Sequence, residues 1–228
     1  SGLWVANALA PRLPETAYLH LGIFNPLRCW GMTNVRVAKS FCMVGGFGID
    51  GGTSAMLGSA LAKPDVLHFG VFGDLSFFYD LNTLGSRHVS NNLRLLVVNN
   101  GEGGEFSVPG NISDNPYCGE RVHDYIAAKG HFSYESSVTI KLISEAFGFE
   151  YISAATSEEF ESAVEKFLTP SSDKPIIFEC RTTVANDRTA LELYNAIEPI
   201  APPGVLRSTA SALIPQCMKN AVKSIIGR

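Results

Sequence analysis

Two polar side chains that suit a metal ion follow two apolar segments of this chain. Asp74 follows the run Leu67–Phe72 after one glycine, and Asn100 directly follows the run Leu93–Asn99. Because the carboxyl ends of parallel strands share one edge of a sheet, both side chains are expected at that edge. Carboxylate and amide oxygens are hard donors of the kind that Mg²⁺ takes, together with phosphate oxygens and water. The pattern therefore predicts a site for Mg²⁺ and a diphosphate.

A plainer interpretation exists for each of these residues. Asp74 can be a helix cap, and Asn99-Asn100 can be an ordinary turn. A Gly-Asp dipeptide alone favours the plain interpretation, whereas Asn-Asn at the end of a buried strand is more specific for a metal site. The glycines after Asn100 also allow a backbone carbonyl to turn inward as a third metal ligand.

A glycine-rich segment, Gly45–Ser54, opens a predicted helix further upstream. The backbone N–H groups of such turns bind phosphate oxygens. The segment lacks the Gly-Lys-Ser/Thr of a P-loop, and it is not a clean GxGxxG dinucleotide fingerprint. It predicts an anion site without naming the anion.

The rest of the chain alternates between strand-like and helix-like segments. The predicted strands are Ala17–Ile23, Phe41–Val44, Leu67–Phe72, Leu93–Asn99, Phe149–Ile152 and Pro175–Arg181. Several of them lack strict alternation, as strands buried on both faces do. The predicted helices are Asp50–Ala62, Ser76–Leu84, Ser137–Phe147 and Ser157–Leu168, with Ser76 and Ser157 as expected N-caps. This order predicts the α/β class: a three-layer α/β/α sandwich with a mostly parallel sheet of about six strands.

Three segments fall outside this alternation. Gly101–Tyr134 is rich in glycine and asparagine and follows Asn100 directly, which predicts a long loop that folds over a ligand. Pro199–Gly204 has the composition of a linker, and Ala210–Ile226 is a predicted amphipathic tail helix. We expect residues 1–198 to form one domain and residues 199–228 to form a linker and tail.

Composition limits the function classes. The chain has 228 residues, of which 46% are hydrophobic, so it can build a sizeable core. The net charge of −4 argues against a broad surface for nucleic acid. No apolar run approaches the roughly 20 residues of a membrane span, and no signal peptide is visible at the start. Scattered cysteines without a CxxC pair favour free thiols in a reducing, cytoplasmic setting.

The three glycine- and asparagine-containing segments together resemble the diphosphate-binding (PP) domain of thiamine-diphosphate (ThDP) dependent enzymes. The signature of that family is Gly-Asp-Gly followed by Asn-Asn, and Leu75 replaces the last glycine here. Within that family the motifs resemble those of the menaquinone-pathway synthases, which join a ThDP-bound succinic semialdehyde unit to isochorismate. This resemblance covers roughly Tyr18 to Arg181 and is carried by Gly48-Ile49-Asp50-Gly51, Gly73-Asp74-Leu75-Ser76 and Asn99-Asn100-Gly101 with Gly103-Gly104 and Phe106.

The resemblance implies that ThDP and Mg²⁺ are the cofactors. It implies that the side chains of Asp74 and Asn100 and the backbone carbonyl of Glu102 hold Mg²⁺. The other residues that it places beside the cofactor are Gly48, Ile49, Asp50, Gly73, Leu75, Ser76, Gly103 and Gly104.

The chain departs from the synthases where they bind substrate. Val44 replaces an arginine before the Gly-Ile-Asp turn, Asn25-Pro26-Leu27-Arg28 replaces an Asn-Ser and shifts the later arginine, and Glu105 replaces an apolar or neutral residue. Because a substrate with several carboxylates needs arginine forks, these changes favour a carboligase or decarboxylase with a different 2-oxo acid. The residues expected near substrate are Asn25, Arg28, Glu105, Phe106 and His131, although the residues around His131 favour an ordinary surface or loop histidine.

The family also needs a pyrimidine-binding (PYR) domain, which carries the glutamate that activates the cofactor. Nothing in this chain supplies one, so the resemblance implies part of a transferase or lyase that is inactive alone. The PYR domain is expected in a longer chain or in a partner subunit, and the exposed apolar surface is expected to drive homo-oligomer formation. Two other functions stay open: a catalytically silent PP-like interaction module and a nucleotide-binding oxidoreductase domain.

Overall fold

The structure is a computed structural model that describes residues 1–44, 46, 48–130 and 137–197. The chain divides into two units, Ser1–Tyr194 and Asn195–Arg228, and the description below concerns the first. The predicted linker Pro199–Gly204, the predicted tail helix Ala210–Ile226 and the substrate candidate His131 lie outside the described residues. The cysteines that the structure describes are all free, as the scattered spacing predicted: Cys29, Cys42, Cys118 and Cys180.

A six-stranded sheet forms the centre of the unit, with the strand order β2-β1-β3-β4-β6-β5. The strands are β1 (Tyr18–Leu21), β2 (Lys39–Cys42), β3 (His68–Gly73), β4 (Leu93–Asn99), β5 (Glu150–Ala154) and β6 (Ile176–Arg181). Every neighbouring pair is parallel. The α/β prediction and the predicted strands are therefore confirmed, with shifts of a few residues at some ends.

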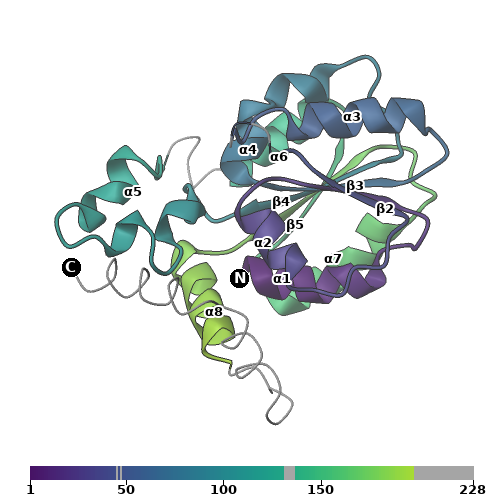
Figure 1. Cartoon of the computed structure of the whole chain (residues 1–228). Coiled ribbons are helices and arrows are strands. Elements are labelled where there is room, and N and C mark those ends of the chain that lie inside the picture. The colour runs from purple at the N-terminus through teal and green to yellow at the C-terminus, as the bar shows by residue number, and fades with distance from the viewer. Residues whose placement is uncertain (45, 47, 131–136, 198–228) are drawn as a thin grey trace, which may run out of the picture. The chain divides into compact units, whose positions relative to one another are not determined.

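Helices cover both faces of the sheet (Figure 1). The longer ones are α1 (Gly2–Leu9), α2 (Asn25–Gly31), α3 (Gly52–Ala62), α4 (Asp74–Tyr79), α6 (Ser137–Ala146), α7 (Ser157–Leu168) and α8 (Val184–Ala196). Helices α1, α2 and α7 lie on one face and α3, α4 and α6 on the other. The unit is thus the three-layer sandwich that the alternation predicted.

The central strand β4 shows how the sequence fills two cores at once. Leu96 packs into the core beneath α1, α2 and α7, whereas Leu95 and Val97 pack into the core beneath α3, α4 and α6. Successive side chains of a strand point to opposite faces, so a strand covered on both sides needs apolar residues throughout. This requirement explains the uninterrupted run Leu95–Val98.

Some predicted helix boundaries and N-caps were wrong. Helix α4 begins at Asp74 with Gly73 as its N-cap, and Ser76 lies inside its first turn. Helix α7 is capped by Thr156, which accepts a hydrogen bond from Glu159 N, and not by Ser157. Helices α1, α2 and α8 were not predicted.

The segment after β4 is more ordered than the predicted long loop. It contains the short 3₁₀ helices η4 (Gly104–Ser107), η5 (Ile112–Asp114) and η6 (Gly119–Arg121), followed by α5 (Val122–Tyr125).

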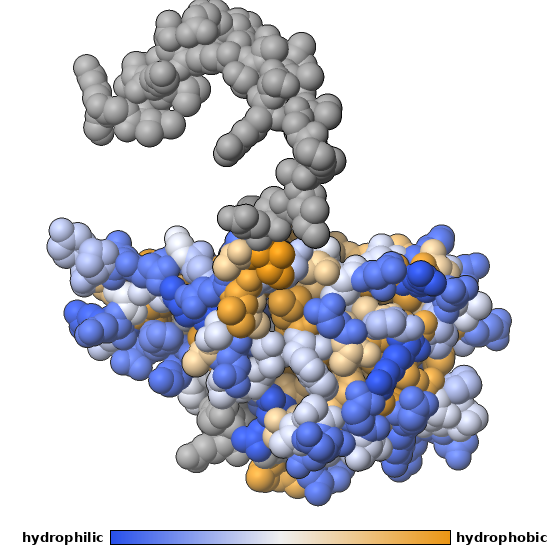
Figure 2. Space-filling view, turned by 90° about the horizontal axis from the view of Figure 1, so that it is seen from below, coloured by the Kyte–Doolittle hydropathy of each residue, from blue (hydrophilic) through white to orange (hydrophobic). Residues whose placement is uncertain are grey.

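The space-filling view in Figure 2 shows apolar side chains interrupting the hydrophilic surface on the face seen from below. Among the described residues, the helices are too short or too polar to cross a membrane.

Candidate functional site

Asp74 and the Asn99-Asn100-Gly101 turn meet at the carboxyl edge of the sheet, as the sequence predicted. Strands β3 and β4 are parallel neighbours in which Gly73 pairs with Val98, so the residues that follow them emerge side by side. The backbone N–H of Gly101 donates a 2.9 Å hydrogen bond to Asp74 Oδ2. Gly101 has a φ of +83°, which lets the chain turn back toward Asp74.

The environment of Asp74 is costly for a carboxylate without a cation. Its side chain is only 6% exposed. Burial raises the pKa of the Asp74 carboxyl to about 7, although backbone hydrogen bonds from Leu75 and Gly101 oppose that rise. A bound cation would favour the ionised form, so this buried carboxylate has the chemistry of a metal ligand.

The Asn99 side chain connects the Asn99-Asn100-Gly101 turn to the neighbouring strand β6. Its Nδ2 donates to Glu179 Oε1 at 2.7 Å, and its Oδ1 accepts from Gly101 N at 3.1 Å. Glu179 lies on β6 with no solvent exposure and also accepts a 2.5 Å hydrogen bond from the Tyr151 hydroxyl. Glu179 was not among the residues predicted from sequence, although a single charge within Ile176–Cys180, which is otherwise apolar, was a signal for a buried polar role.

Asn100 is oriented by helix α8. Its Nδ2 donates to Asp187 Oδ2 at 3.1 Å, while its Oδ1 accepts a long 3.3 Å hydrogen bond from Glu102 N. The other Asp187 oxygen, Oδ1, accepts from Gly2 N at 2.7 Å. The amide nitrogen of Asn100 is therefore held firmly, and its oxygen, the atom that a metal would bind, is held weakly.

Glu102, the third predicted metal ligand, directly follows this turn. Its backbone carbonyl accepts a 2.8 Å hydrogen bond from Gly104 N. A carbonyl oxygen has two lone pairs, so this hydrogen bond leaves one for a cation. No group of three or more His, Cys, Asp or Glu side chains suits a metal in the described part of the chain. A site made of one carboxylate, one amide and one carbonyl is compatible with that finding, and its all-oxygen donor set fits Mg²⁺.

The glycine-rich segment reaches the same edge of the sheet. Ser76 Oγ in the first turn of α4 donates a 2.5 Å hydrogen bond to the Ile49 carbonyl. Asp80 then fixes the start of α3 by accepting from Ser54 N at 2.6 Å. Of the predicted cofactor-binding residues, Ile49 and Ser76 are thus in contact, and Gly48 and Asp50 flank Ile49 in the chain.

The predicted substrate residues Asn25, Arg28 and Glu105 form one cluster. Arg28 Nη1 and Nη2 donate to Glu105 Oε2 and Oε1 at 2.8 and 3.0 Å, and Nη1 also donates to Asn25 Oδ1. The cluster adjoins the metal candidates, because a Cβ on Gly104 would lie 2.5 Å from Asn100 Nδ2 and 2.9 Å from Asn25 Nδ2. Phe106 packs nearby, 3.3 Å from the position of a Cβ on Gly103.

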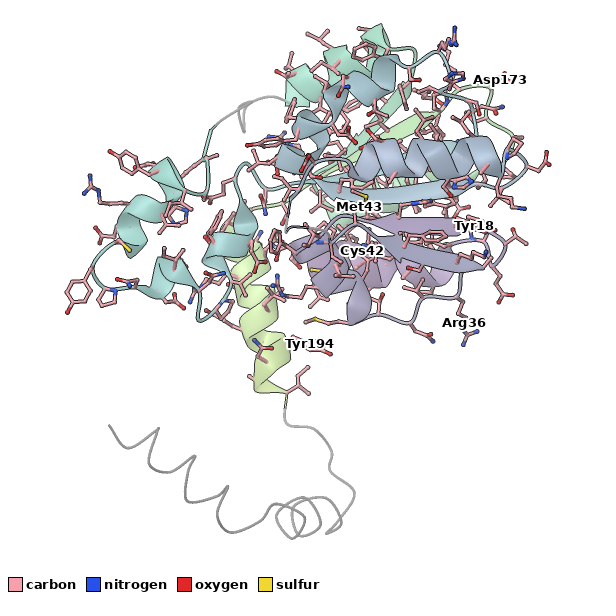
Figure 3. All side chains as sticks on the ribbon, turned by 45° about the horizontal axis from the view of Figure 1, so that its top comes forward. Tyr18, Arg36, Cys42, Met43, Asp173 and Tyr194 are labelled. Atoms are coloured by element: carbon pink, nitrogen blue, oxygen red, sulfur yellow. The ribbon has the colours of Figure 1, made fainter. Side chains whose placement is uncertain are left out.

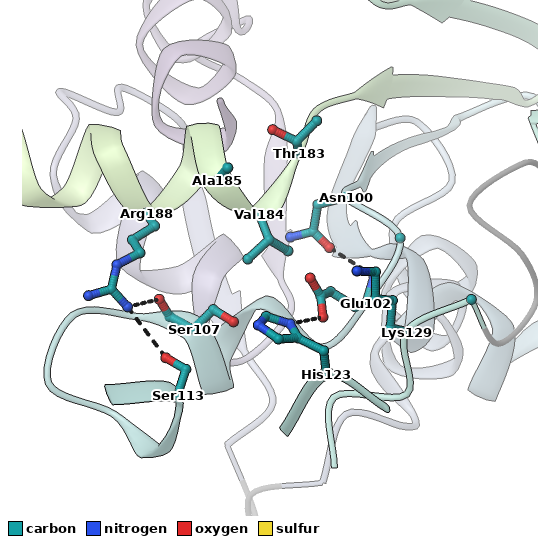
Figure 4. A pocket seen from close by; sticks show the side chains of 12 residues that line it. Asn100, Glu102, Ser107, Ser113, His123, Lys129, Thr183, Val184, Ala185 and Arg188 are labelled. Carbon is teal, nitrogen blue, oxygen red and sulfur yellow. Dashed lines mark hydrogen bonds and ion pairs between the residues drawn. The ribbon is translucent and has the colours of Figure 1, made fainter. Parts of the chain in front are cut away.

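A cavity of about 810 Å³ lies between the segment after β4 and the start of α8 (Figure 4). Its wall includes Asn100, Gly101 and Glu102, and His123 faces it from α5. His123 Nδ1 lies 2.6 Å from Glu102 Oε2, and the Glu102 side chain is 7% exposed. Sequence analysis did not select His123, because nothing in the local sequence indicates that it meets Glu102.

The comparisons with known proteins concern the fold and the sequence resemblance. Among solved structures, the fold matches a Rhodococcus jostii thiamine diphosphate-dependent 4-hydroxybenzoylformate decarboxylase with a TM-score of 0.58, at 19% identity over 80% of this chain and 32% of that one. The fold is therefore that of a ThDP-dependent enzyme. No family model matches the chain.

The sequence relatives are more specific. The chain is 33% identical to the 2-succinyl-5-enolpyruvyl-6-hydroxy-3-cyclohexene-1-carboxylate synthase of Phocaeicola vulgatus over 85% of its length. It is 34% identical to the synthase of the same name from Bacteroides thetaiotaomicron over 82% of its length. It spans about a third of the length of these relatives, 33% and 32% respectively. The resemblance to this synthase that the motifs predicted is confirmed.

Proposed function

We propose that this chain is the Mg²⁺–ThDP-binding PP domain of a cytoplasmic carboligase or decarboxylase that acts on a 2-oxo acid. One observation carries the proposal: the 2.9 Å hydrogen bond between Gly101 N and Asp74 Oδ2. It brings the two predicted metal-binding segments, which are far apart in sequence, to one point at the carboxyl edge of a parallel sheet. That edge is where open α/β sheets bind their ligands.

Each residue of this site has a distinct role in the proposal. Asp74 Oδ, Asn100 Oδ1 and the Glu102 carbonyl hold Mg²⁺, while Gly73, Leu75 and Ser76 flank the diphosphate at the start of α4. Asn99, Glu179 and Asp187 do not touch the cofactor, but they fix the turn that carries the metal ligands. The bound ThDP would supply an electron sink for the carbanion formed from the substrate, and the protein supplies orientation.

Exposed apolar residues beside the glycine-rich segment support a partner domain. Phe41, Met43 and Val44 are 44%, 44% and 51% exposed. They belong to β2 or follow it, and β2 is the edge strand of the sheet. Apolar side chains gathered at an uncovered sheet edge favour burial by another chain or domain. We assign this surface to the PYR domain, in a longer chain or in a partner subunit of a homo-oligomer.

The test is calorimetric titration of the full chain with ThDP, first without Mg²⁺, then with Mg²⁺, then after addition of a chelator. We expect binding only with Mg²⁺, and loss of binding in the Asp74→Ala variant. Asp173→Asn is the matched control, because Asp173 precedes β6 and lies at the opposite edge of the sheet (Figure 3). The chain alone should not turn over a 2-oxo acid.

A negative result has a defined meaning. If the wild-type chain binds no ThDP with Mg²⁺ at millimolar concentration, the proposed Mg²⁺–ThDP site fails and the silent interaction module is favoured. If Asp74→Ala and Asp173→Asn bind equally well, the metal site is elsewhere. Turnover of a 2-oxo acid by the pure chain would contradict the need for a PYR domain.

A further inference from the structure

A residue with an unusual backbone conformation precedes the helix that carries Arg28. Helix α2 begins at Asn25, four residues after the end of β1, and Arg28 lies in its last turn. The residue before this helix, Phe24, has a φ of +67°, which a phenylalanine rarely adopts. Strain of this kind persists where the surroundings enforce it, commonly at functional sites. The unusual residue is the N-cap of α2, four residues before Arg28.

Glu105 accepts hydrogen bonds from both terminal nitrogens of the Arg28 guanidinium. The two contacts, of 2.8 and 3.0 Å, run in parallel from Nη1 and Nη2 to the two carboxylate oxygens. Both side chains are largely covered, with 28% and 21% exposure. A planar guanidinium with two parallel donors is the preferred protein receptor for a carboxylate, so Glu105 fills the position that a ligand carboxylate would take.

Glu105 is itself held in place. Its backbone carbonyl accepts a 2.8 Å hydrogen bond from Asn111 Nδ2, and it lies in η4 next to Gly104. Gly104 separates the amides of Asn25 and Asn100, since a Cβ there would meet both. The Arg28–Glu105 pair is therefore anchored immediately beside the turn that carries the proposed metal ligands.

We propose that Glu105 determines substrate specificity by withholding Arg28 from substrate carboxylates. The site then selects a 2-oxo acid whose remaining part is uncharged and rejects one that carries a second carboxylate. The inference deepens the proposed function and rests on it for the identity of the reaction. The pairing itself is independent of any cofactor, so it can be tested without one.

The test is titration of the full chain, with no cofactor present, using two probes: 2-oxoglutarate, which has a second carboxylate, and 2-oxobutyrate, which has none. Wild-type protein should bind 2-oxoglutarate no more tightly than 2-oxobutyrate. Glu105→Gln should tighten 2-oxoglutarate binding by about tenfold or more, the equivalent of one good charged contact, and leave 2-oxobutyrate unchanged. Glu105→Leu should give the same gain, and it provides the test if Glu105→Gln does not fold.

Two controls identify the cause of any gain. Adding Arg28→Met to Glu105→Gln should abolish the gain if the freed guanidinium is the receptor. Glu161→Gln, which breaks the remote pair between Glu161 and Arg12, should change neither probe. An unchanged 2-oxoglutarate affinity in both Glu105 variants overturns the proposal, as does a wild-type preference for 2-oxoglutarate. A ThDP titration of the same samples reports separately on the proposed function.

Discussion

Asn99 Nδ2 lies 2.7 Å from Glu179 Oε1, so the turn that presents Asn100 rests on a carboxylate with no solvent exposure. The Tyr151 hydroxyl donates to the other oxygen of the same carboxylate. A buried charge with two good donors is stable, but each partner depends on the others, since an unpaired buried polar group is costly. The position of the proposed metal-binding turn is therefore linked to the stability of the sheet.

Replacement of Glu179 tests this link. Glu179→Ala should lower the free energy of unfolding by about 3 kcal/mol, because it leaves Asn99 and Tyr151 without their acceptor. Glu179→Gln retains one acceptor oxygen and should lose less. Urea denaturation gives both values, and ThDP titration should show weaker binding in the folded Ala variant. Equal losses in the two variants would contradict the hydrogen-bond explanation.

Asp74→Asn should separate stability from binding. The folded pKa of about 7 exceeds the ordinary value of 3.8, so the unfolded chain loses this proton more readily than the folded chain does. The carboxylate therefore opposes folding of the metal-free chain increasingly as pH rises from about 4 to 7, and fully above that. At pH 8 without Mg²⁺, we expect the Asn variant to have a higher Tm than wild type. Added Mg²⁺ and ThDP should stabilise the wild type alone, and a lower Tm of the metal-free variant would refute this account.

The paired histidines His20 and His68 predict sensitivity to acid. His20 Nε2 lies 3.2 Å from His68 Nδ1. Burial lowers the pKa of His20 from 6.5 to about 4, and it also lowers the pKa of His68. Because the unfolded chain then binds more protons, stability is complete above pH 6.5 and falls as pH drops toward 4. Between pH 7.5 and pH 5, His20 alone should cost about 2 kcal/mol. Denaturation at both pH values should show a smaller loss in His20→Gln and an unchanged loss in the control His88→Gln.

Gly104→Ala tests the close packing between the two candidate clusters. The added methyl group would lie 2.5 Å from Asn100 Nδ2 and 2.9 Å from Asn25 Nδ2, which forces both amides to move. We expect ThDP binding in the presence of Mg²⁺ to fall by at least about tenfold, because the Asn100 oxygen leaves its position. Gly58→Ala is the matched control, since a Cβ there meets nothing within 4 Å. That variant lies in α3 and should bind normally and gain up to about 1 kcal/mol of stability. Normal binding by Gly104→Ala would show that the amides adjust freely.

The sequence predicted best where local pattern and burial agree. Strand β4 and helix α7 have the predicted boundaries, because one is buried on both faces and the other has apolar residues at helical spacing. The N-cap of α7 was placed one residue late because Thr156 and Ser157 both suit that position, and only the backbone geometry separates them. Asp74 and Asn100 were selected as metal candidates because each directly follows a recognisable strand.

The residues that support the site were not predictable in the same way. Glu179, Asp187 and His123 contact Asn99, Asn100 and Glu102 across 80, 87 and 21 residues of sequence. No periodicity or local propensity reports such pairs, since they arise only when strands and helices pack. The Arg28–Glu105 pair is similar: both residues were candidates, but their mutual neutralisation requires the fold.

Asp187 has a consequence for the order in which the molecule matures. One carboxylate contacts Gly2, Thr182 and Asn100, so it joins helix α1, the residue after β6 and the proposed metal-binding turn. Synthesis proceeds from the amino end, so Asn100 is made before its hydrogen-bond partner Asp187, which lies 87 residues downstream. Strands β1, β3 and β4 are complete long before that point. Asn100 therefore gains this hydrogen bond only after all the described strands of the sheet have been synthesised.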